Sequence, residues 1–307
     1  MIVIEDISHI RFRAPDLAQM RLFLEDFGLS TIDDGNRIFS HCTGQAPVCH
    51  ITEQGEAAFV ALGLRASSMA DLEKLSVDEG VPITEFNAPG GGKMVKLIDP
   101  NGFVIEVVAE QELRPLSRSS ASPSFNSGHD HPRLGRAPLV RPSPAEVVRL
   151  GHCVLEVADF RISETWYKER FGFLTSDEIE FMPGAAIGAF MRCDLGNLPA
   201  DHHTLFLLQA QSEPKFNHAA FEVAGIDALM AGHDHLAAKG YTPWWGVGRH
   251  ILGNQIFDYW CDPWGHMLEH WTDGDLLTAA DPPAQASVMD LLGVQWGPQM
   301  QMPASGG

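Results

Sequence analysis

A glutamate stands on an otherwise apolar stretch near the end of the chain. Glu269 lies between Leu268 and His270 in the segment FDYWCDPWGHMLEH (257–270), which has the pattern of two strands joined by a tight turn. A carboxylate buried without a cation or a strong hydrogen-bond donor beside it is energetically costly. The position of Glu269 therefore predicts a cation close to its carboxylate.

Two histidines on other predicted strands supply the rest of such a site. Because side chains alternate along a strand, we expect His152 to share a face with Val154, and His218 to share a face with Phe216 and Ala220. If each polar residue points inward, three strands bring two imidazoles and one carboxylate together. That set holds Fe(II) on one face and leaves the opposite coordination positions open. A single histidine on an apolar strand is more often a hydrogen-bonded core residue, but matching places in a repeated unit favour the metal site.

The elements that must position these residues repeat along the chain. Each half has a His followed by an Asp seven residues later and then an amphipathic helix ending at Phe-Gly, and each closes with Asp-Pro-x-Gly and a Glu. We expect four similar strand–helix–strands units in two domains, 1–109 and 149–272. Residues 110–148, rich in Pro, Ser and Arg, are the expected linker, and 273–307 the C-terminal tail. The matching segments are 7–29 with 150–173, 56–80 with 218–240, and 99–107 with 262–270.

Composition narrows the function further. The 307 residues include 45% apolar ones and carry a formal charge of −19, which argues against nucleic acid or an anionic membrane as a partner. The five cysteines contain no CxxC pair, which is typical of reduced thiols in a cytoplasmic protein. The N-terminus carries charges within its apolar run, unlike a secretory signal.

Four such units in two pairs resemble the vicinal oxygen chelate superfamily, which includes glyoxalases, bleomycin resistance proteins and dioxygenases. The resemblance implies an α+β fold of two domains, each with two paired βαβββ modules that form a half-open barrel. Residues 145–272 look like the catalytic domain of type I extradiol ring-cleavage dioxygenases. Five polar positions carry this likeness by their spacing: His203 is fifteen residues before His218, His250 nine before Tyr259, and Tyr259 ten before Glu269.

This resemblance implies an extradiol (meta) ring-cleaving dioxygenase that inserts both atoms of O2 into a catechol-type or polyhydroxylated aromatic ring at a mononuclear non-haem Fe(II). Mn(II) suits the same ligands, which would be His152, His218 and Glu269. By the same resemblance, His203 is the acid–base residue, while His250 and Tyr259 hydrogen-bond the substrate oxygens. The expected partners are a small aromatic diol, O2 and further copies of the chain, since such enzymes commonly form homo-oligomers.

Apolar residues near the expected ligands should line the substrate pocket, because flat apolar walls suit an aromatic ring. Val154, Phe190 and Trp244 are the expected contacts. Asn254 joins them because the loop after His250 reads ILGN and lacks the early polar residue of biphenyl-type enzymes. His202 is expected on the opposite strand face from its neighbour at 203, in a supporting role. The tail could cover the pocket mouth or form a subunit contact.

Two other functions fit the same fold. A glyoxalase-type metal-dependent isomerase or lyase would normally take a fourth protein ligand from the strand near 209, where Gln209 is the only candidate. A non-catalytic protein that binds aromatic ligands would need no metal ligands at all. The retained histidines and glutamate favour the dioxygenase over both.

The first half invites a second metal site, since His9 and Glu106 occupy the places of two ligands in the second half. Its middle place is Glu56 where the second half has His218. Arg11 shares the strand face of His9 and would oppose a cation. We expect no metal there, and a structural role for this half.

Overall fold

Each half of the chain has two modules, and each module begins with a strand followed by a helix. The structure is a computed structural model that describes residues 1–115 and 125–300. The first half contains β1 (Ile4–Ala14), α1 (Leu17–Phe27), β2 (Ser30–Asp33), β3 (Arg37–His41), β4 (His50–Gln54), β5 (Ala58–Ala66), α2 (Met69–Glu79), β6 (Thr84–Glu85), β7 (Lys93–Ile98) and β8 (Val104–Ala109).

The second half repeats this order with one additional two-residue strand in its first module, and then adds short elements from the tail. It contains β9 (Val147–Val157), α3 (Phe160–Phe171), β10 (Leu174–Met182), β11 (Ala185–Arg192), β12 (Ala200–Asp201), β13 (Leu205–Gln209), β14 (Lys215–Val223), α4 (Ile226–Lys239), β15 (Thr242–His250), β16 (Ile256–Cys261), β17 (Met267–Thr272), β18 (Leu276–Leu277), β19 (Ala284–Ser287), α5 (Val288–Leu292) and β20 (Val294–Trp296).

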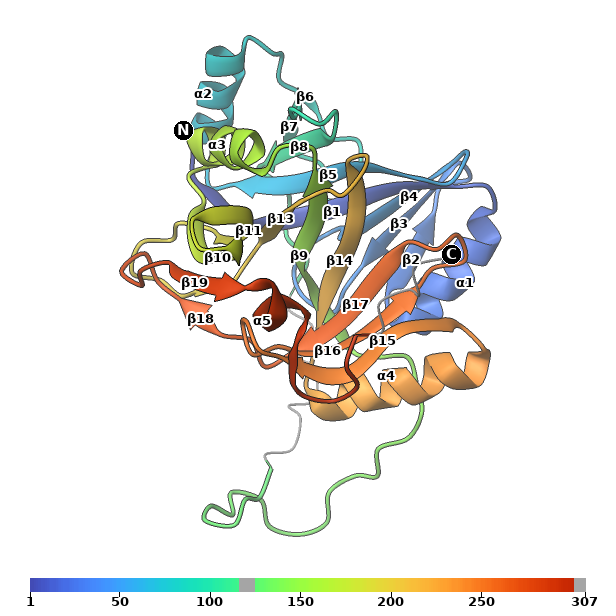
Figure 1. Cartoon of the computed structure of the whole chain (residues 1–307). Coiled ribbons are helices and arrows are strands. Elements are labelled where there is room, and N and C mark those ends of the chain that lie inside the picture. The colour runs from blue at the N-terminus through green and yellow to red at the C-terminus, as the bar shows by residue number, and fades with distance from the viewer. Residues whose placement is uncertain (116–124, 301–307) are drawn as a thin grey trace, which may run out of the picture.

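Two large sheets, one from each half, form the body of the protein (Figure 1). The first sheet has eight strands in the order β2-β3-β4-β1-β5-β8-β7-β6, and the second has ten in the order β19-β10-β11-β13-β9-β14-β17-β16-β15-β20. At the centre of each sheet the leading strands of two modules pair antiparallel, β1 with β5 and β9 with β14. The predicted α+β fold of paired βαβββ modules is confirmed.

The Asp and Phe-Gly signals of the repeat mark the two ends of a helix. Asp16 and Asp159 are the N-caps of α1 and α3, and each accepts a hydrogen bond from a backbone N–H of the first turn, at 2.9 and 3.0 Å. Gly28 and Gly172 end these helices with φ of 114° and 68°, in the left-handed region that favours glycine. The spacing from His to Asp thus sets where each strand ends and its helix begins.

One continuous apolar core joins the two halves. Phe12 on β1 lies 5.1 Å from Phe216 on β14, ring centre to ring centre, and 5.4 Å from Phe59 on β5. Phe27 on α1 stacks on His270 of β17 at 3.8 Å, and the His270 imidazole donates a hydrogen bond to the Phe27 carbonyl. The first half therefore supports the strands that carry the predicted ligands.

Phe12→Ala should lower the free energy of unfolding by about 3–5 kcal/mol, because it leaves a cavity between two packed sheets that cannot move together to fill it. Urea unfolding followed by tryptophan fluorescence and by circular dichroism would measure the loss. Leu22→Ala is the matched control, since Leu22 is 61% exposed on α1. A change in unfolding free energy no larger than that of the control would contradict the shared core.

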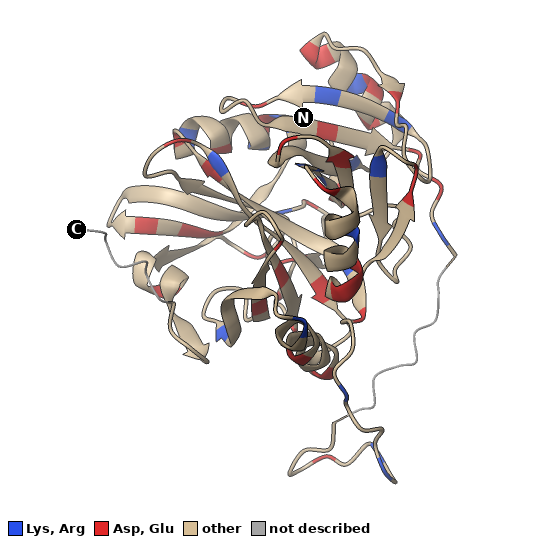
Figure 2. Cartoon of the chain, turned by 90° about the vertical axis from the view of Figure 1, so that its right-hand side faces the viewer, with Lys and Arg blue, Asp and Glu red and all other residues tan. Residues whose placement is uncertain are grey.

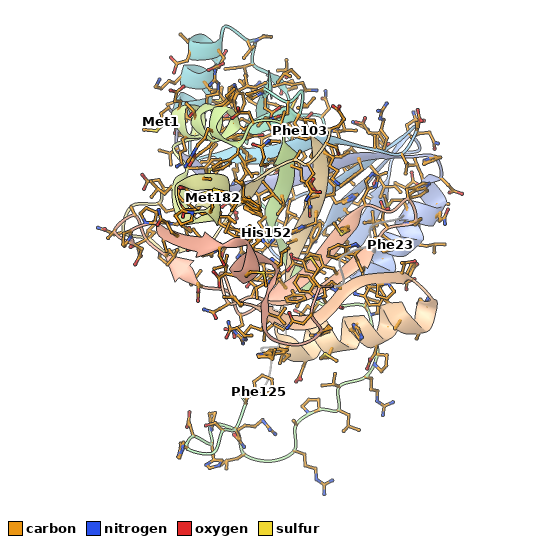
Figure 3. All side chains as sticks on the ribbon, viewed as in Figure 1. Met1, Phe23, Phe103, Phe125, His152 and Met182 are labelled. Carbon is orange, nitrogen blue, oxygen red and sulfur yellow. The ribbon has the colours of Figure 1, made fainter. Side chains whose placement is uncertain are left out.

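The expected linker and tail differ in structure. Residues 125–142, part of the expected linker, contain no helix or strand and extend away from both sheets, Ala145 is buried in the core, and 116–124 lie outside the described residues (Figures 1 and 3). The tail returns to the second sheet, where β19 pairs with β10 and β20 pairs with β15. Residues 301–307 of that tail also lie outside the description.

Charge and hydropathy on the folded chain follow the composition. Acidic residues are spread over both sheets and the helices, with Lys and Arg interspersed among them (Figure 2). No helix within 1–115 and 125–300 has the length and apolar character needed to cross a membrane.

Candidate metal centre

Three neighbouring strands deliver the three predicted ligands to one place. His152 comes from β9, His218 from β14 and Glu269 from β17, which follow one another in the sheet. The Oε2 atom of Glu269 lies 3.3 Å from Nε2 of His152 and 3.4 Å from Nε2 of His218, and one potential ligand atom from each residue lies within 4.8 Å of the others. His152 is labelled in Figure 3, inside the body of the molecule.

The chemistry of this set fits a divalent cation. Glu269 is fully buried, and neither of its carboxylate oxygens makes a hydrogen bond within the described structure. Burial alone would raise the pKa of Glu269, but the imidazoles of His152, His218 and His250 hold it well below its ordinary value, so the carboxylate is charged. A charged, buried carboxylate without a hydrogen bond, beside two imidazoles, is a metal-binding set.

A β-bulge re-aims His218, and here one prediction from strand alternation is wrong. Phe216 pairs with Leu155 and His218 with Val154, so that Asn217 is an extra residue on β14. Phe216 therefore packs into the core between the halves rather than sharing the face of His218. Bulges commonly redirect side chains beside functional sites.

The bulged residue orients the ligand that follows it. Because Asn217 and His218 now point to the same side, Nδ1–H of His218 donates to Oδ1 of Asn217 at 2.8 Å, which leaves Nε2 free for a metal. The Asn217 amide in turn donates to Glu156 at 2.8 Å. Asn217 was not among the residues predicted from sequence, although a polar residue directly before a ligand histidine was a usable signal.

Asn217→Ala should lower metal affinity by roughly 10- to 100-fold, because the ring of His218 loses the acceptor that fixes its orientation. Competition of the protein with a fluorescent chelator for Fe(II) or Zn(II) would measure the change. Lys215→Ala, an exposed position on the same strand, is the matched control. Equal affinities of the two variants would contradict this role.

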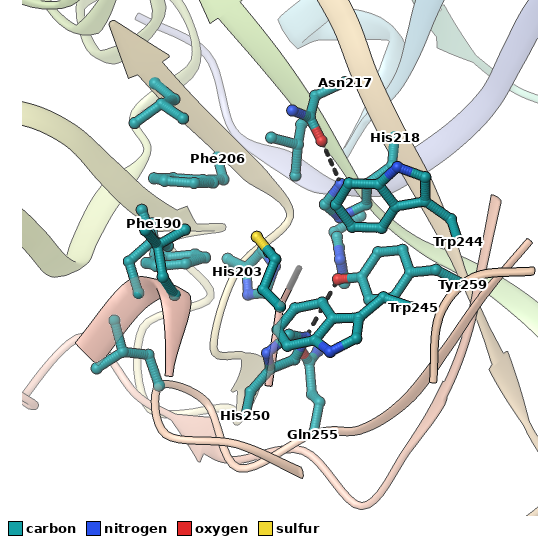
Figure 4. A pocket seen from close by; sticks show the side chains of 17 residues that line it. Phe190, His203, Phe206, Asn217, His218, Trp244, Trp245, His250, Gln255 and Tyr259 are labelled. Atoms are coloured by element: carbon teal, nitrogen blue, oxygen red, sulfur yellow. Dashed lines mark hydrogen bonds between the residues drawn. The ribbon is translucent and has the colours of Figure 1, made fainter. Parts of the chain in front are cut away.

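A cavity of about 180 Å³ opens beside the triad (Figure 4). Val154, Phe190 and Trp244, the expected substrate contacts, all line it. Phe190 stacks on Phe206 at 4.0 Å at one end, while Trp244 and Trp245 stand at the other end. Apart from the histidines, no basic side chain and no carboxylate is among the described residues that line this cavity.

Asn254 is the expected contact that the structure does not support. Its amide is held by hydrogen bonds to both carboxylate oxygens of Asp275 and by one from Gln295, and it does not line the cavity. Its φ of 57° lies in the left-handed region, where the chain reverses. Gln255, the next residue, lines the cavity instead and is buried.

Three further polar residues face the cavity around the triad. The ring of His203 lies 3.9 Å from that of His152, centre to centre, and Nε2 of His250 is 3.1 Å from the hydroxyl of Tyr259. Burial first, and then the charge of Glu269, raise the pKa of Tyr259 well above its usual range, so its hydroxyl stays protonated. Figure 4 shows His203, His250 and Tyr259 on different sides of one space.

His202 and His203 lie close together rather than on opposite faces of a strand. Both precede β13, and their Nδ1 atoms are 3.1 Å apart. His202 does not line the cavity, and its Nε2 lies 2.7 Å from the carboxylate of Asp177. Alternation did not apply because the ladder begins only at Leu205.

The tail contributes to the cavity wall. Leu291 and Leu292 of α5 and Met300 line it, and Nε1 of Trp245 donates a hydrogen bond to the carbonyl of Pro298 at 2.7 Å. Of the two possibilities left open for the tail, the described part, up to residue 300, lies over the cavity.

The first half carries a different arrangement at the matching place. Nε2 of His9 lies 2.8 Å from Glu106, and the guanidinium of Arg11 lies 2.8 Å from the same oxygen. Burial favours the neutral acid, yet His9 and Arg11 hold the pKa of Glu106 well below its ordinary value. Strand pairing aligns Ala61, not Glu56, with His218, because Ala61 pairs with Arg11 as His218 pairs with Val154. Glu106 therefore has a guanidinium as its cation.

Comparisons with known proteins find sequences similar to this chain. The model of the Glyoxalase/Bleomycin resistance protein/Dioxygenase superfamily matches residues 149–270. Metapyrocatechase 2 of Cupriavidus necator is 27% identical over 301 residues, which span 97% of this chain and 90% of the relative.

Two solved structures share the fold. The Mn(II)-bound glyoxalase from Novosphingobium aromaticivorans superposes with a TM-score of 0.80 at 21% identity, covering 99% of this chain and 96% of that chain. The 2,3-dioxygenase LapB from Pseudomonas sp. KL28 superposes with a TM-score of 0.77 at 20% identity, covering 94% and 98%.

Proposed function

Because this chain is a type I extradiol dioxygenase of the glyoxalase, bleomycin resistance protein and dioxygenase superfamily, we propose that it opens an aromatic diol with O2 at a mononuclear Fe(II) centre. Both oxygen atoms enter the ring-opened product, so the reaction consumes no external reductant. The observation that carries the proposal is the buried carboxylate of Glu269, unpaired and facing two imidazoles beside an apolar cavity.

His152, His218 and Glu269 would hold the metal. Bound by these three protein ligands, Fe(II) would keep coordination positions open for the diol oxygens and O2 and would supply the redox chemistry. Mn(II) fits the same three donors, and the Novosphingobium glyoxalase, which shares the fold, is Mn(II)-bound. We favour iron because the reaction needs a metal that exchanges electrons readily.

The chain's own residues move the protons. His203 faces the cavity beside His152, and burial together with His152 and His202 holds its pKa well below the usual value, so that it is a neutral base at neutral pH. It takes a proton from a substrate hydroxyl and later returns it to an oxygen derived from O2. His250 and Tyr259, already hydrogen-bonded to each other, orient the diol oxygens.

The cavity favours a diol whose ring substituent is uncharged and apolar. Its walls away from the triad are aromatic and aliphatic, including Phe190, Phe206, Leu208, Leu252 and Leu291, with no Lys or Arg to pair a carboxylate among the lining residues described. A charged substituent would lose its hydration there without a partner. An alkylcatechol is accordingly the substrate that we expect.

The isomerase alternative lacks its fourth ligand. The side chain of Gln209 accepts a hydrogen bond from the backbone of Phe160 at 3.0 Å and donates one to the carbonyl of Ala158, and it does not line the cavity. The non-catalytic alternative leaves the buried charge of Glu269 without a purpose. Ring cleavage needs both O2 and a metal, whereas the isomerase needs a metal but no O2, and the binding protein needs neither.

The deciding experiment is anaerobic reconstitution with Fe(II), or with Mn(II) in parallel, followed by addition of O2 and a panel of diols. We expect one O2 consumed per diol and a coloured ring-opened product, with 4-ethylcatechol turned over far better than 3,4-dihydroxyphenylacetate. Substrate consumption without O2 would favour the isomerase. Full-strength diol binding after metal removal, without turnover, would favour the binding protein.

The remaining expectations from sequence belong to this proposal too. A cytoplasmic location is consistent with five free cysteines, four of them buried. Assembly of several copies into a homo-oligomer stays a prediction, which size-exclusion chromatography with light scattering would test.

A further inference from the structure

A chain of three polar side chains runs from the cavity toward the outer strands of the second sheet. Nδ1 of His203 lies 3.1 Å from Nδ1 of His202, and Nε2 of His202 lies 2.7 Å from Oδ2 of Asp177. The inner end, His203, lines the cavity, whereas neither His202 nor Asp177 does. Asp177 lies on β10, and the two histidines precede β13.

The protein holds His202 from several directions. Its backbone N–H donates to the Asp275 carbonyl at 2.9 Å, and its own carbonyl accepts a hydrogen bond from Ser176 Oγ at 2.6 Å. A Cβ atom on Gly253 would lie 2.9 Å from Nδ1 of His202, so the loop approaches too closely for any side chain there. These contacts leave the imidazole little freedom to turn.

A second β-bulge brings two of the residues that hold His202 to the same side of β10. Thr175 pairs with Met191 and Asp177 with Phe190, so Ser176 is an extra residue on β10. Successive residues of a regular strand point to opposite faces, but here both Ser176 and Asp177 reach His202. Arg192 donates to Ser176 Oγ at 2.9 Å and fixes it in turn.

The donor and acceptor count along the chain fixes where the hydrogens lie. The carboxylate oxygen of Asp177 accepts the hydrogen bond, so Nε2 of His202 carries the hydrogen between them. When the His202 imidazole carries that hydrogen alone, its Nδ1 is an acceptor. Nδ1 of His203 must therefore donate to it. Nε2 of His203 is left without a hydrogen, and it makes no hydrogen bond to any residue that the structure describes.

We propose that Asp177 and His202 are positioning residues that hold His203 as the tautomer whose bare Nε2 faces the cavity. The inference rests on the proposed function, since a bare Nε2 is what His203 needs to accept a substrate proton. If the order of hydrogens were reversed, Nε2 would carry a hydrogen and could no longer act as that base. A carboxylate that orients a histidine in this way can contribute several orders of magnitude in rate.

Asp177→Asn reverses the donor and acceptor roles along the hydrogen-bonded row Asp177–His202–His203, because the asparagine amide N–H can donate to Nε2 of His202. We expect kcat to fall about 10²- to 10⁴-fold, with KM for 4-ethylcatechol changed less than about threefold and the metal content unchanged. Asp177→Glu, which keeps the acceptor, should recover at least about tenfold of that loss. Glu178→Gln is the matched control, since Glu178 is the adjacent carboxylate on β10 and pairs with Arg161 instead.

A second measurement does not depend on turnover. In the full-length protein labelled with ¹⁵N-histidine and loaded with diamagnetic Zn(II), the NMR signals of His203 should report a hydrogen on Nδ1 in the wild type and on Nε2 in Asp177→Asn. A wild-type His203 with its hydrogen on Nε2, or an unchanged kcat in Asp177→Asn, would overturn the inference. Absence of ring cleavage by the wild type, with the expected tautomer present, would instead overturn the proposed function.

Discussion

His218→Ala is expected to abolish metal binding and ring cleavage together. The variant leaves one imidazole and one carboxylate, and the bulge that presents His218 offers no neighbouring donor to replace it: Phe216 faces the core and Asn217 is committed to Glu156. With two protein ligands in place of three, iron is held neither tightly nor with the open face that a diol and O2 require.

Metal analysis after reconstitution and oxygen-electrode traces with 4-ethylcatechol would measure both losses. His129→Ala is a suitable control, because His129 is an exposed histidine on the segment that extends from the body. Circular dichroism should show both variants folded. Stoichiometric iron in His218→Ala would contradict the proposed ligand set, even if activity were lost.

His203→Gln is expected to keep the metal and lose most of the turnover. His203 contacts the ring of His152 but is not in the metal-binding group, so the three ligands remain. Glutamine cannot accept and return a proton at neutral pH, and general acid–base groups contribute roughly 10²- to 10⁴-fold to a rate. The fall should be in kcat, with iron content equal to that of the wild type.

Phe206→Leu separates this effect from a simple change in the cavity wall. Phe206 lines the same end of the cavity, beside Phe190, but carries no proton-transfer group. We expect its KM for 4-ethylcatechol to change more than its kcat. Loss of iron from His203→Gln would instead assign His203 to metal binding and refute its role as a base.

The repeat explains why most of the fold and the triad could be predicted. An Asp at a fixed distance after His9 and His152 caps a helix, and the capped helix fixes how far the strand before it extends. Glu269 was predictable for a separate reason: a carboxylate on a buried strand needs a cation, whatever the details of the fold.

Bulges and reversals explain most of the errors. The bulge at Asn217 places consecutive residues on one face, and no alternating pattern of apolar residues reveals that. Asn254 adopts a left-handed backbone conformation, which turns its side chain away and brings Gln255 to the cavity. In each case, one residue of displacement changed which side chain faces the site.

The mistaken match of Glu56 with His218 has a different origin. The letters Ala-Ala-Phe occur in both segments, but strand pairing aligns Ala61 with His218, and each of these stands eight residues before its following helix. Distance to the next helix was therefore a better guide than identity of letters. Hydrogen-bonded chains such as that from Asp177 to His203 join residues of different strands, so they depend on strand order, which spacing alone does not give.

The return of the C-terminal segment to the second sheet bears on how the protein should be handled in the laboratory. Met300, the last described residue, lines the cavity, so a label attached at residue 300 itself would stand at the cavity wall. The opposite terminus offers a better attachment point, since Met1 is 69% exposed and remote from the cavity lining. Kinetic constants from protein labelled at residue 300 should therefore be compared with those from protein labelled at Met1 before they are assigned to the enzyme.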